Sequence, residues 1–96
     1  MNEYEQFLNE VGIHDKGTLT DDDEYVIEFD DPDVQSRMFS ALEKSNKIGL
    51  DVGTQKVDFS KYQFTNLYKS DSYEIELFSD FDDDEYKLTV RKRIED

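Results

Sequence analysis

The sequence predicts an α+β domain in which two helices pack on one face of a mainly antiparallel sheet of about four to five strands. Apolar residues recur at helical spacing in residues 2–11 and 31–46. In the segments between and after them, apolar and polar residues alternate as they do in half-buried strands. At 96 residues the chain is expected to form a single compact acidic domain, residues 1–96, with one modest core.

The first helix is expected over residues 2–11. Its apolar stripe consists of Tyr4, Phe7, Leu8 and Val11. Glu3 and Glu5 lie in the first turn, where the helix dipole favours anions, and Gly12 supplies a natural stop.

The second helix is expected to begin after Asp31, an N-cap residue followed by Pro32 at the first helical position. Its core stripe consists of Val34, Met38, Ala41 and Leu42, with Phe39 beside it. Asn46 is the expected C-cap, and Lys44 and Lys47 suit the negative end of the helix dipole.

Alternation of apolar and polar residues predicts the strands. Residues 13–20 are expected to form a loop that turns at Gly17, and residues 25–29 a strand. After the second helix, Ile48, Leu50 and Val52 predict a short strand that ends in a turn at residues 53–54, after which Val57 and Phe59 continue the alternation. Residues 62–69 form a further strand, but Phe64, Leu67 and Tyr68 leave its inward face open.

The last third of the chain predicts an antiparallel hairpin. A turn at residues 70–72 precedes it. Tyr73, Ile75 and Leu77 alternate with Glu74 and Glu76, and after an acidic turn at residues 79–85 the alternation resumes at Tyr86, Leu88 and Val90 and can reach Ile94. Two strands joined by a short turn pair most simply with each other.

Composition excludes several classes of protein. There are 25 acidic and 11 basic residues, a net charge of −14, so the chain is expected to repel nucleic acid and anionic membranes. Its 14% aromatic content favours a folded domain over a disordered acidic tail. The sequence shows no signal peptide, no apolar run of membrane-spanning length and no cysteine, which together predict a cytoplasmic protein.

The sequence contains no recognisable catalytic constellation. His14 is the only histidine and lies in a polar loop near Asp15, and no phosphate-binding, nucleotide-binding or nucleophile motif occurs. We therefore predict that the protein is not an enzyme and uses no cofactor.

One acidic segment partly resembles a calcium-binding loop. Asp80, Asp82 and Asp84 match the opening of the EF-hand pattern, but Glu85 stands where glycine is required and Arg91 where the final glutamate belongs. No metal site is predicted from this match.

Residues 91–93 form the only basic cluster. Its cations are expected to pair with carboxylates across the sheet, or to lie on an edge strand and discourage aggregation there.

The acidic residues are concentrated in two blocks. Residues 21–33 and residues 71–85 each hold eight carboxylates and no cation, in turns and at outward strand positions. Outward positions repeat every ~6.6–6.8 Å along a strand, about two phosphate steps of one DNA strand at ~3.4 Å each. Two hypotheses follow: a solubilising surface, or an anionic decoy for a nucleic-acid-binding protein.

This charge placement is similar to that of phage-encoded DNA-mimic inhibitors, which include anti-CRISPR and anti-restriction proteins. Residues 21–24, 30–33 and 80–85 carry the resemblance, which is one of composition rather than of a motif. It implies a non-enzymatic inhibitor, in a bacterial host cytoplasm and monomeric or weakly dimeric, that occupies the basic groove of a nucleic-acid-binding protein. The residues expected to bind the partner are Asp21, Asp22, Asp23, Glu24, Glu28, Asp30, Glu74, Glu76, Asp80, Phe81, Asp82, Asp83, Asp84 and Glu85.

Exposed aromatic residues, among them Phe81, Tyr68 and Phe78, are expected to anchor that partner. Three alternatives remain open: an immunity protein for a toxin nuclease, a calcium-responsive adaptor, and a plain prophage-borne domain whose acidity serves solubility.

Overall fold

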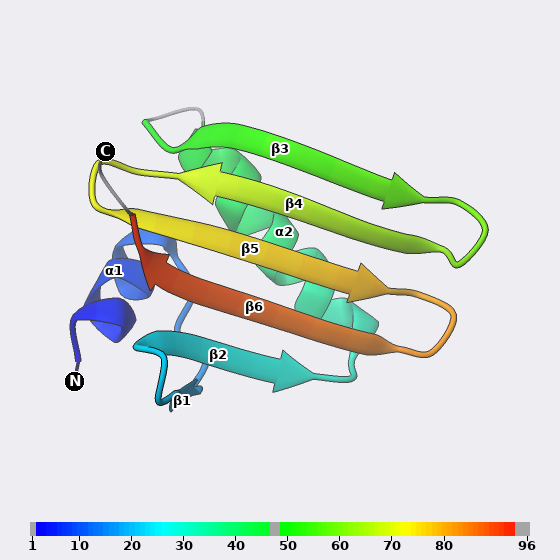
Figure 1. The fold of residues 1–96 in the computed structure, drawn as a ribbon, viewed down its shortest axis with the longest axis horizontal. Helices are drawn as coiled ribbons and strands as arrows, with labels where there is room; N and C mark the ends of the chain where they lie inside the picture. Colours follow the sequence, from blue (N-terminus) through cyan, green and yellow to red (C-terminus); the bar gives the residue numbers. More distant parts are fainter. Residues whose placement is uncertain (1, 47–48, 94–96) are drawn as a thin grey trace.

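The computed structural model describes residues 2–46 and 49–93, which form two helices and a six-stranded antiparallel sheet (Figure 1). The α+β class is therefore confirmed, but the sheet has more strands than the four to five predicted. The elements are α1 (Glu3–Val11), β1 (Thr18–Leu19), β2 (Glu24–Phe29), α2 (Pro32–Asn46), β3 (Asp51–Asp58), β4 (Gln63–Lys69), β5 (Tyr73–Asp80) and β6 (Glu85–Lys92).

The strands lie in the order β1-β2-β6-β5-β4-β3, and each neighbouring pair is antiparallel. The predicted hairpin of β5 and β6 is confirmed. The last strand, β6, is inserted between β2 and β5, so β6 is a central strand. The prediction that the basic residues 91–93 lie on an edge strand is therefore wrong.

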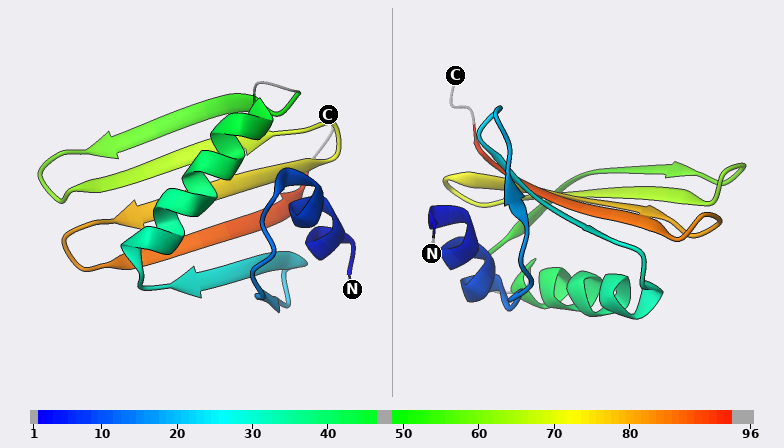
Figure 2. Two further views of the ribbon diagram at one scale, coloured as in Figure 1. Left: turned by 180° about the vertical axis from the view of Figure 1, so that it is seen from behind. Right: turned by 90° about the horizontal axis from the view of Figure 1, so that it is seen from below.

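Figure 2 shows both helices on the same side of the sheet. The second helix crosses that side diagonally, whereas α1 lies only over the end of the sheet at which β2 and β5 begin (Figure 2), where Phe7 stacks on Tyr73. The prediction of two helices packed on one face therefore holds only coarsely. The turns that join β3 to β4 and β5 to β6 extend beyond α2, and this leaves part of the helix side of the sheet uncovered by a helix (Figure 2).

The core lies between the helices and the sheet. It consists of the apolar stripes of the helices, the helix-side positions of the strands and two residues of connecting segments, Ile13 and Leu50: Tyr4, Leu8, Ile13, Tyr25, Ile27, Met38, Leu42, Leu50, Tyr68, Ile75, Leu77, Leu88 and Val90. Both predicted helix stripes contribute to it, because Val11, Val34 and Ala41 pack against the same cluster. No helix among the described residues is long and apolar enough to cross a membrane.

The predicted end of α1 at Gly12 and start of α2 after Asp31 are confirmed, whereas Asn2, expected inside the first helix, is its N-cap, and Asn46, expected as a C-cap, is the last residue of α2. The side chain of Asn2 accepts a hydrogen bond from the backbone N–H of Glu5 at 2.9 Å, and Gly12 ends α1 in the left-handed conformation, with φ of 102°. At the start of α2, Asp31 Oδ1 accepts a hydrogen bond from the backbone N–H of Asp33 at 2.9 Å, and Pro32 is the first helical residue. These contacts satisfy backbone groups that have no partner within the helix.

Strand β1 was missed because two residues are too few to show alternation. It lies in the predicted loop of residues 13–20 and pairs with β2. Gly17 precedes it, and a Cβ there would collide with the carbonyl oxygen of Val26, so only glycine lets the two strands approach. The hydroxyl of Tyr25 accepts a hydrogen bond from the backbone N–H of Gly17 at 2.6 Å.

Two further predictions about the strands are wrong. The turn expected at residues 53–54 is absent, because both residues lie inside β3, where the register to β4 shifts between Val52 and Gln55. Phe59 belongs to the turn after β3 and not to a strand.

The structure also settles the register of β4 and the ends of the last hairpin. The positions of Phe64, Asn66 and Tyr68 pair with Ser79, Leu77 and Ile75, which places them on the helix side. The acidic turn covers only residues 81–84, because β5 extends to Asp80 and β6 begins at Glu85. The expected contributions of Lys47, Ile48 and Ile94 lie outside the described residues.

Candidate protein-binding surface

Because β2 pairs with β6, the acidic residues of these strands and of the turns beside them lie at two opposite ends of the sheet. Because the strands are antiparallel, the start of β2 lies beside the end of β6, and Glu24 pairs with Arg91. At the other end Phe29 pairs with Tyr86, so the segment that follows β2 meets the acidic turn that precedes β6. These ends are separated along β6 by about 20 Å, at ~3.4 Å per residue.

At the end of the sheet near Arg91, which we call the ion-paired end, two cations partly offset five carboxylates. The guanidinium of Arg91 lies 3.8 Å from Glu24, 3.4 Å from Glu74 and 3.5 Å from Glu76. Lys92 Nζ lies 3.3 Å from Glu3 and 3.5 Å from Asp23. The prediction that the basic cluster pairs with carboxylates across the sheet is confirmed for Arg91, whereas the partners of Lys92 lie on α1 and in the turn before β2. Glu24, Glu74 and Glu76 are thus partnered, although they were expected to face a basic protein.

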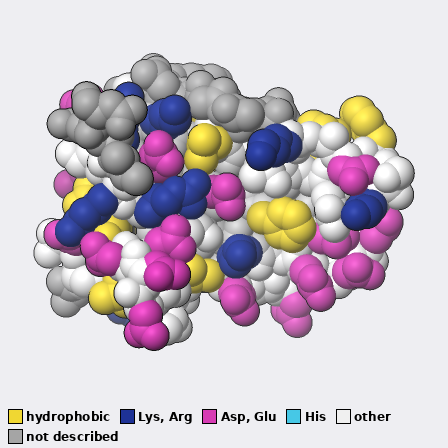
Figure 3. Space-filling view, in the orientation of Figure 1, with side chains coloured by type: hydrophobic (Ala, Val, Ile, Leu, Met, Phe, Trp, Pro, Cys, Tyr) yellow, Lys and Arg dark blue, Asp and Glu magenta, His cyan; other side chains and the backbone are white. Residues whose placement is uncertain are grey.

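At the opposite end lie eight exposed carboxylates, which we call the acidic end: Glu28, Asp30, Asp31, Asp33, Asp82, Asp83, Asp84 and Glu85. Within residues 2–46 and 49–93, no salt bridge involves any of them. Figure 3, which views the sheet from the side opposite the helices, shows acidic side chains gathered where β2 ends and β6 begins. The sequence predicted carboxylates in both segments but not that the two segments meet.

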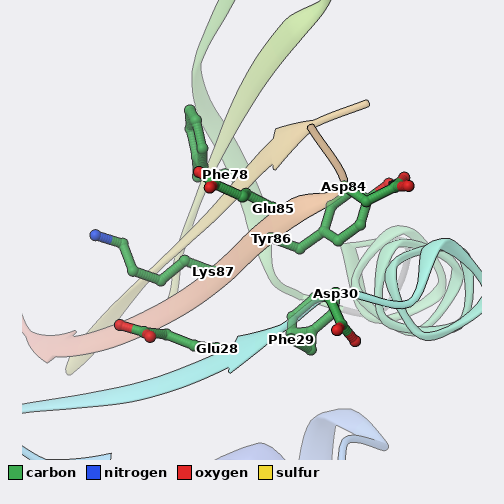
Figure 4. Close-up of a pocket in the computed structure, with 8 residues that line it drawn as sticks. All are labelled: Glu28, Phe29, Asp30, Phe78, Asp84, Glu85, Tyr86 and Lys87. Atoms are coloured by element: carbon green, nitrogen blue, oxygen red, sulfur yellow. Dashed lines mark hydrogen bonds between the residues drawn. The ribbon is translucent and has the colours of Figure 1, made fainter. Parts of the chain in front are cut away.

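A hollow of about 400 Å³ lies between these two segments. In Figure 4 the residues around it are Glu28, Phe29, Asp30, Phe78, Asp84, Glu85, Tyr86 and Lys87. Phe29 and Tyr86 stack with ring centroids 5.4 Å apart. The hydroxyl of Tyr86 donates to Asp84 Oδ1 at 3.0 Å. Burial, this hydrogen bond and the negative charges of Asp84, Asp80 and Asp31 raise the pKa of Tyr86 to about 12.

Asp80 differs from the other acidic residues of its block, because it is only 4% exposed. Its carboxylate accepts hydrogen bonds from the backbone N–H groups of Asp82 and Asp83, both at 3.1 Å, and from Gln63 Nε2 at 3.0 Å. The hydrogen bond from Gln63 and those from the backbone lower the pKa of Asp80. Asp80 therefore holds the turn that presents Asp82 and Asp83, and it is not placed to contact a partner.

The first predicted acidic block is divided between the two ends. Asp21, Asp22 and Asp23 are exposed in the turn before β2, at the ion-paired end. Asp23 adopts a left-handed conformation with φ of 59°, and its carbonyl accepts a hydrogen bond from the Tyr4 hydroxyl at 2.9 Å.

An aromatic groove on the helix side was missed by the sequence analysis. It has a volume of about 310 Å³ and is lined by Gln35, Phe39, Tyr62, Phe64, Asn66 and Phe81. Of the three predicted aromatic anchors, Phe81 lines this groove and Phe78 lines the acidic hollow. The prediction that Tyr68 is an exposed anchor is wrong, because its side chain is 1% exposed and its hydroxyl donates to Glu43 at 3.2 Å. Because the sequence left the inward face of β4 open, it predicted neither the aromatic groove nor the burial of Tyr68.

Two further sequence features are the histidine and the acidic turn that partly resembles a calcium-binding loop. His14 is exposed, with Nδ1 2.8 Å from Asn9 Oδ1. Among the residues that the structure describes, no three carboxylate or imidazole side chains are grouped as a metal site would require. The chain matches no protein-family model, no curated protein and no solved structure.

Proposed function

We propose that this protein is a non-enzymatic inhibitor that mimics nucleic acid and blocks the basic groove of a cytoplasmic nucleic-acid-binding protein. The observation that carries the proposal is the acidic end, where eight exposed carboxylates from two separate segments lie together without an ion pair among the described residues. Elsewhere in the same sheet, cations offset comparable carboxylates.

Three features hold these carboxylates in place. The β2–β6 pairing holds Glu28 beside Lys87 and Phe29 beside Tyr86, Asp80 holds the turn of Asp82 and Asp83, and the start of α2 carries Asp31 and Asp33. A rigid array of like charges destabilises the protein that carries it, but it is favourable where a partner supplies lysines and arginines. Such a surface accelerates encounter with a basic groove and makes the complex sensitive to salt.

The test begins with a partner captured from nuclease-treated bacterial lysate on the immobilised protein and eluted with salt. The decisive measurement is the displacement of fluorescently labelled DNA or RNA from that purified partner. We expect the protein to displace the nucleic acid competitively, with an inhibition constant that rises with salt. A partner that binds the protein and nucleic acid at the same time would contradict the proposal. A partner that is itself a toxin nuclease would make the protein an immunity protein.

Matched variants locate the contact. The double variant Asp82→Asn/Asp83→Asn removes two charges from the acidic end, and Asp21→Asn/Asp22→Asn removes two from the ion-paired end. All four residues are exposed and none forms a salt bridge within the described part of the chain. We expect the first variant to inhibit roughly ten-fold more weakly, from two screened charge pairs, and the second to behave as wild type. Equal affinities for both variants and the wild type would rule out the acidic end as the contact.

A further inference from the structure

The aromatic groove lies beside the acidic end, and the two surfaces share the turn between β5 and β6. Phe81 is the first residue of that turn and lines the groove, and the exposed carboxylates of Asp82 and Asp83 follow it directly. The ring of Phe81 also contacts that of Tyr86 at 5.6 Å, and Tyr86 lines the acidic hollow. Aromatic and acidic surfaces are therefore continuous.

The groove is a built feature rather than a chance gap. The backbone N–H of Phe81 donates to the carbonyl of Tyr62 at 3.1 Å and ties the turn after β3 to the turn after β5. The rings of Tyr62, Phe64 and Phe81 contact one another with centroids 5.3–5.6 Å apart. Phe59 extends this group, with its ring 6.4 Å from that of Phe64.

Large aromatic surfaces remain in contact with solvent here. Phe59 is 83% exposed, Tyr62 is 51% exposed and Phe39 is 36% exposed. Phe59 and Tyr62 lie in the turn between β3 and β4, which extends beyond α2 (Figure 2), whereas Phe39 lies on α2 and with Gln35 lines one side of the groove. Contiguous exposed apolar side chains rimmed by polar ones are typical of interaction sites.

The chemistry of the groove distinguishes between the two cations that a basic protein offers. Four aromatic residues line the groove together with two amide residues, Gln35 and Asn66, and Gln35 Nε2 donates to Ser79 Oγ at 3.2 Å. A guanidinium stacks on aromatic rings and donates several N–H groups in its plane, whereas an ammonium is strongly hydrated and compact. Carboxylates next to the rings favour the cation further.

We propose that the aromatic groove binds an arginine side chain of the protein partner, presented next to the lysines and arginines that meet the acidic end. This rests on the proposed function, since it names the group on the basic partner that the groove selects. The acidic end supplies attraction for any cation, and the groove supplies the preference for arginine.

Oligoarginine and oligolysine peptides of equal length and charge are the probes, and calorimetry measures their affinities at low salt. We expect both to bind, with oligoarginine binding roughly two- to five-fold more tightly, as an exposed cation–π contact allows. In NMR spectra the ring resonances of Tyr62, Phe39 and Phe81 should shift with oligoarginine and much less with oligolysine.

The double variant Tyr62→Ala/Phe39→Ala removes two exposed rings from the groove and should abolish the preference while leaving the oligolysine affinity unchanged. Leu19→Ala is the control, because Leu19 is 50% exposed on β1, away from the groove. Equal affinities of the two peptides for the wild type, no binding of oligoarginine at low salt, or a preference that persists in the double variant would each overturn the inference. So would sedimentation that shows a dimer broken by the double variant, because a second copy of the chain would then occupy the groove.

Failure of this inference is distinguishable from failure of the proposed function. If the groove does not select arginine, Asp82→Asn/Asp83→Asn still weakens displacement of nucleic acid from the captured partner. If the proposed function fails, that displacement is absent whatever the peptides do.

Discussion

Aspartates of one turn serve different purposes according to where their carboxylates point. Asp80 is buried and accepts three hydrogen bonds, whereas Asp82 and Asp83 donate backbone N–H groups to it and keep their own carboxylates exposed. Asp84 takes a left-handed conformation with φ of 50° and accepts from the Tyr86 hydroxyl. These aspartates are equivalent in composition. Their hydrogen bonds distinguish Asp80, which stabilises the turn, from Asp82 and Asp83, whose carboxylates are exposed.

The lowered pKa of Asp80 leads to a prediction about acid stability. In the folded protein Asp80 binds a proton less readily than in the unfolded chain, so its carboxylate stabilises the fold above the unfolded pKa of about 3.9. This contribution is lost as the pH falls through the lower, folded pKa. We expect Asp80→Asn to reduce the free energy of unfolding at neutral pH and the difference from wild type to shrink below about pH 4.

Urea unfolding of the wild type and the variant across this pH range measures the difference. Asp82→Asn is the matched control, because the Asp82 side chain is exposed. A difference that stays constant down to acid pH would show that the charge of Asp80 does not stabilise the turn.

At the scale of elements, β6 decides how charge is distributed. The first residue of β6, Glu85, belongs to the acidic end. Near the other end of the strand, Arg91 lies among the carboxylates of β2 and β5. Arg91 bridges two neighbouring strands, and without it Glu24, Glu74 and Glu76 would repel one another.

We predict that Arg91→Gln lowers the free energy of unfolding by about 1 kcal/mol at low salt, the upper range for partly exposed ion pairs. The effect should diminish at high salt, because screening weakens both the lost attractions and the new repulsion. Urea unfolding at two salt concentrations measures it. Arg93→Gln is the control with the same change of charge, because the Arg93 side chain donates to the backbone carbonyl of Ser70. Equal effects of both variants would mean that only net charge matters.

At the scale of the whole molecule, the net charge of −14 is unevenly offset. At one end of the sheet, Arg91 and Lys92 form ion pairs with carboxylates. At the acidic end, no carboxylate forms an ion pair with a described residue. Like charges that lie together without a cation destabilise the fold, whereas carboxylates paired with cations stabilise it.

The corresponding prediction is that Asp82→Asn/Asp83→Asn leaves the free energy of unfolding unchanged or raises it by a few tenths of a kcal/mol at low salt, since like-charge repulsion is relieved. Added salt should stabilise the wild type more than this variant. Thermal unfolding at low and high salt tests both statements. A loss of more than about 1 kcal/mol would show instead that these carboxylates support the fold.

Much of the fold could be predicted because local patterns specify it. The stripe through Tyr4 and Leu8, the Asp31–Pro32 start of α2 and the alternation around Ile75 and Leu88 each depend on neighbours a few residues apart. Errors occurred where tertiary contacts override or escape a local pattern. The close approach at Gly17 made a strand of two residues, and the register shift in β3 replaced an expected turn.

The sequence by itself determined the two helices, the stop at Gly12, the Asp31 start of α2, the last hairpin and the concentration of acid in two blocks, because these follow from spacing and composition. Tertiary structure decided which carboxylates of the described residues form ion pairs and which do not. That division follows from the pairing of β2 with β6, segments far apart in the chain that must both bury their helix-side residues. The same burial placed Tyr68 in the core and left Tyr62 at the surface, where the aromatic groove meets the acidic end.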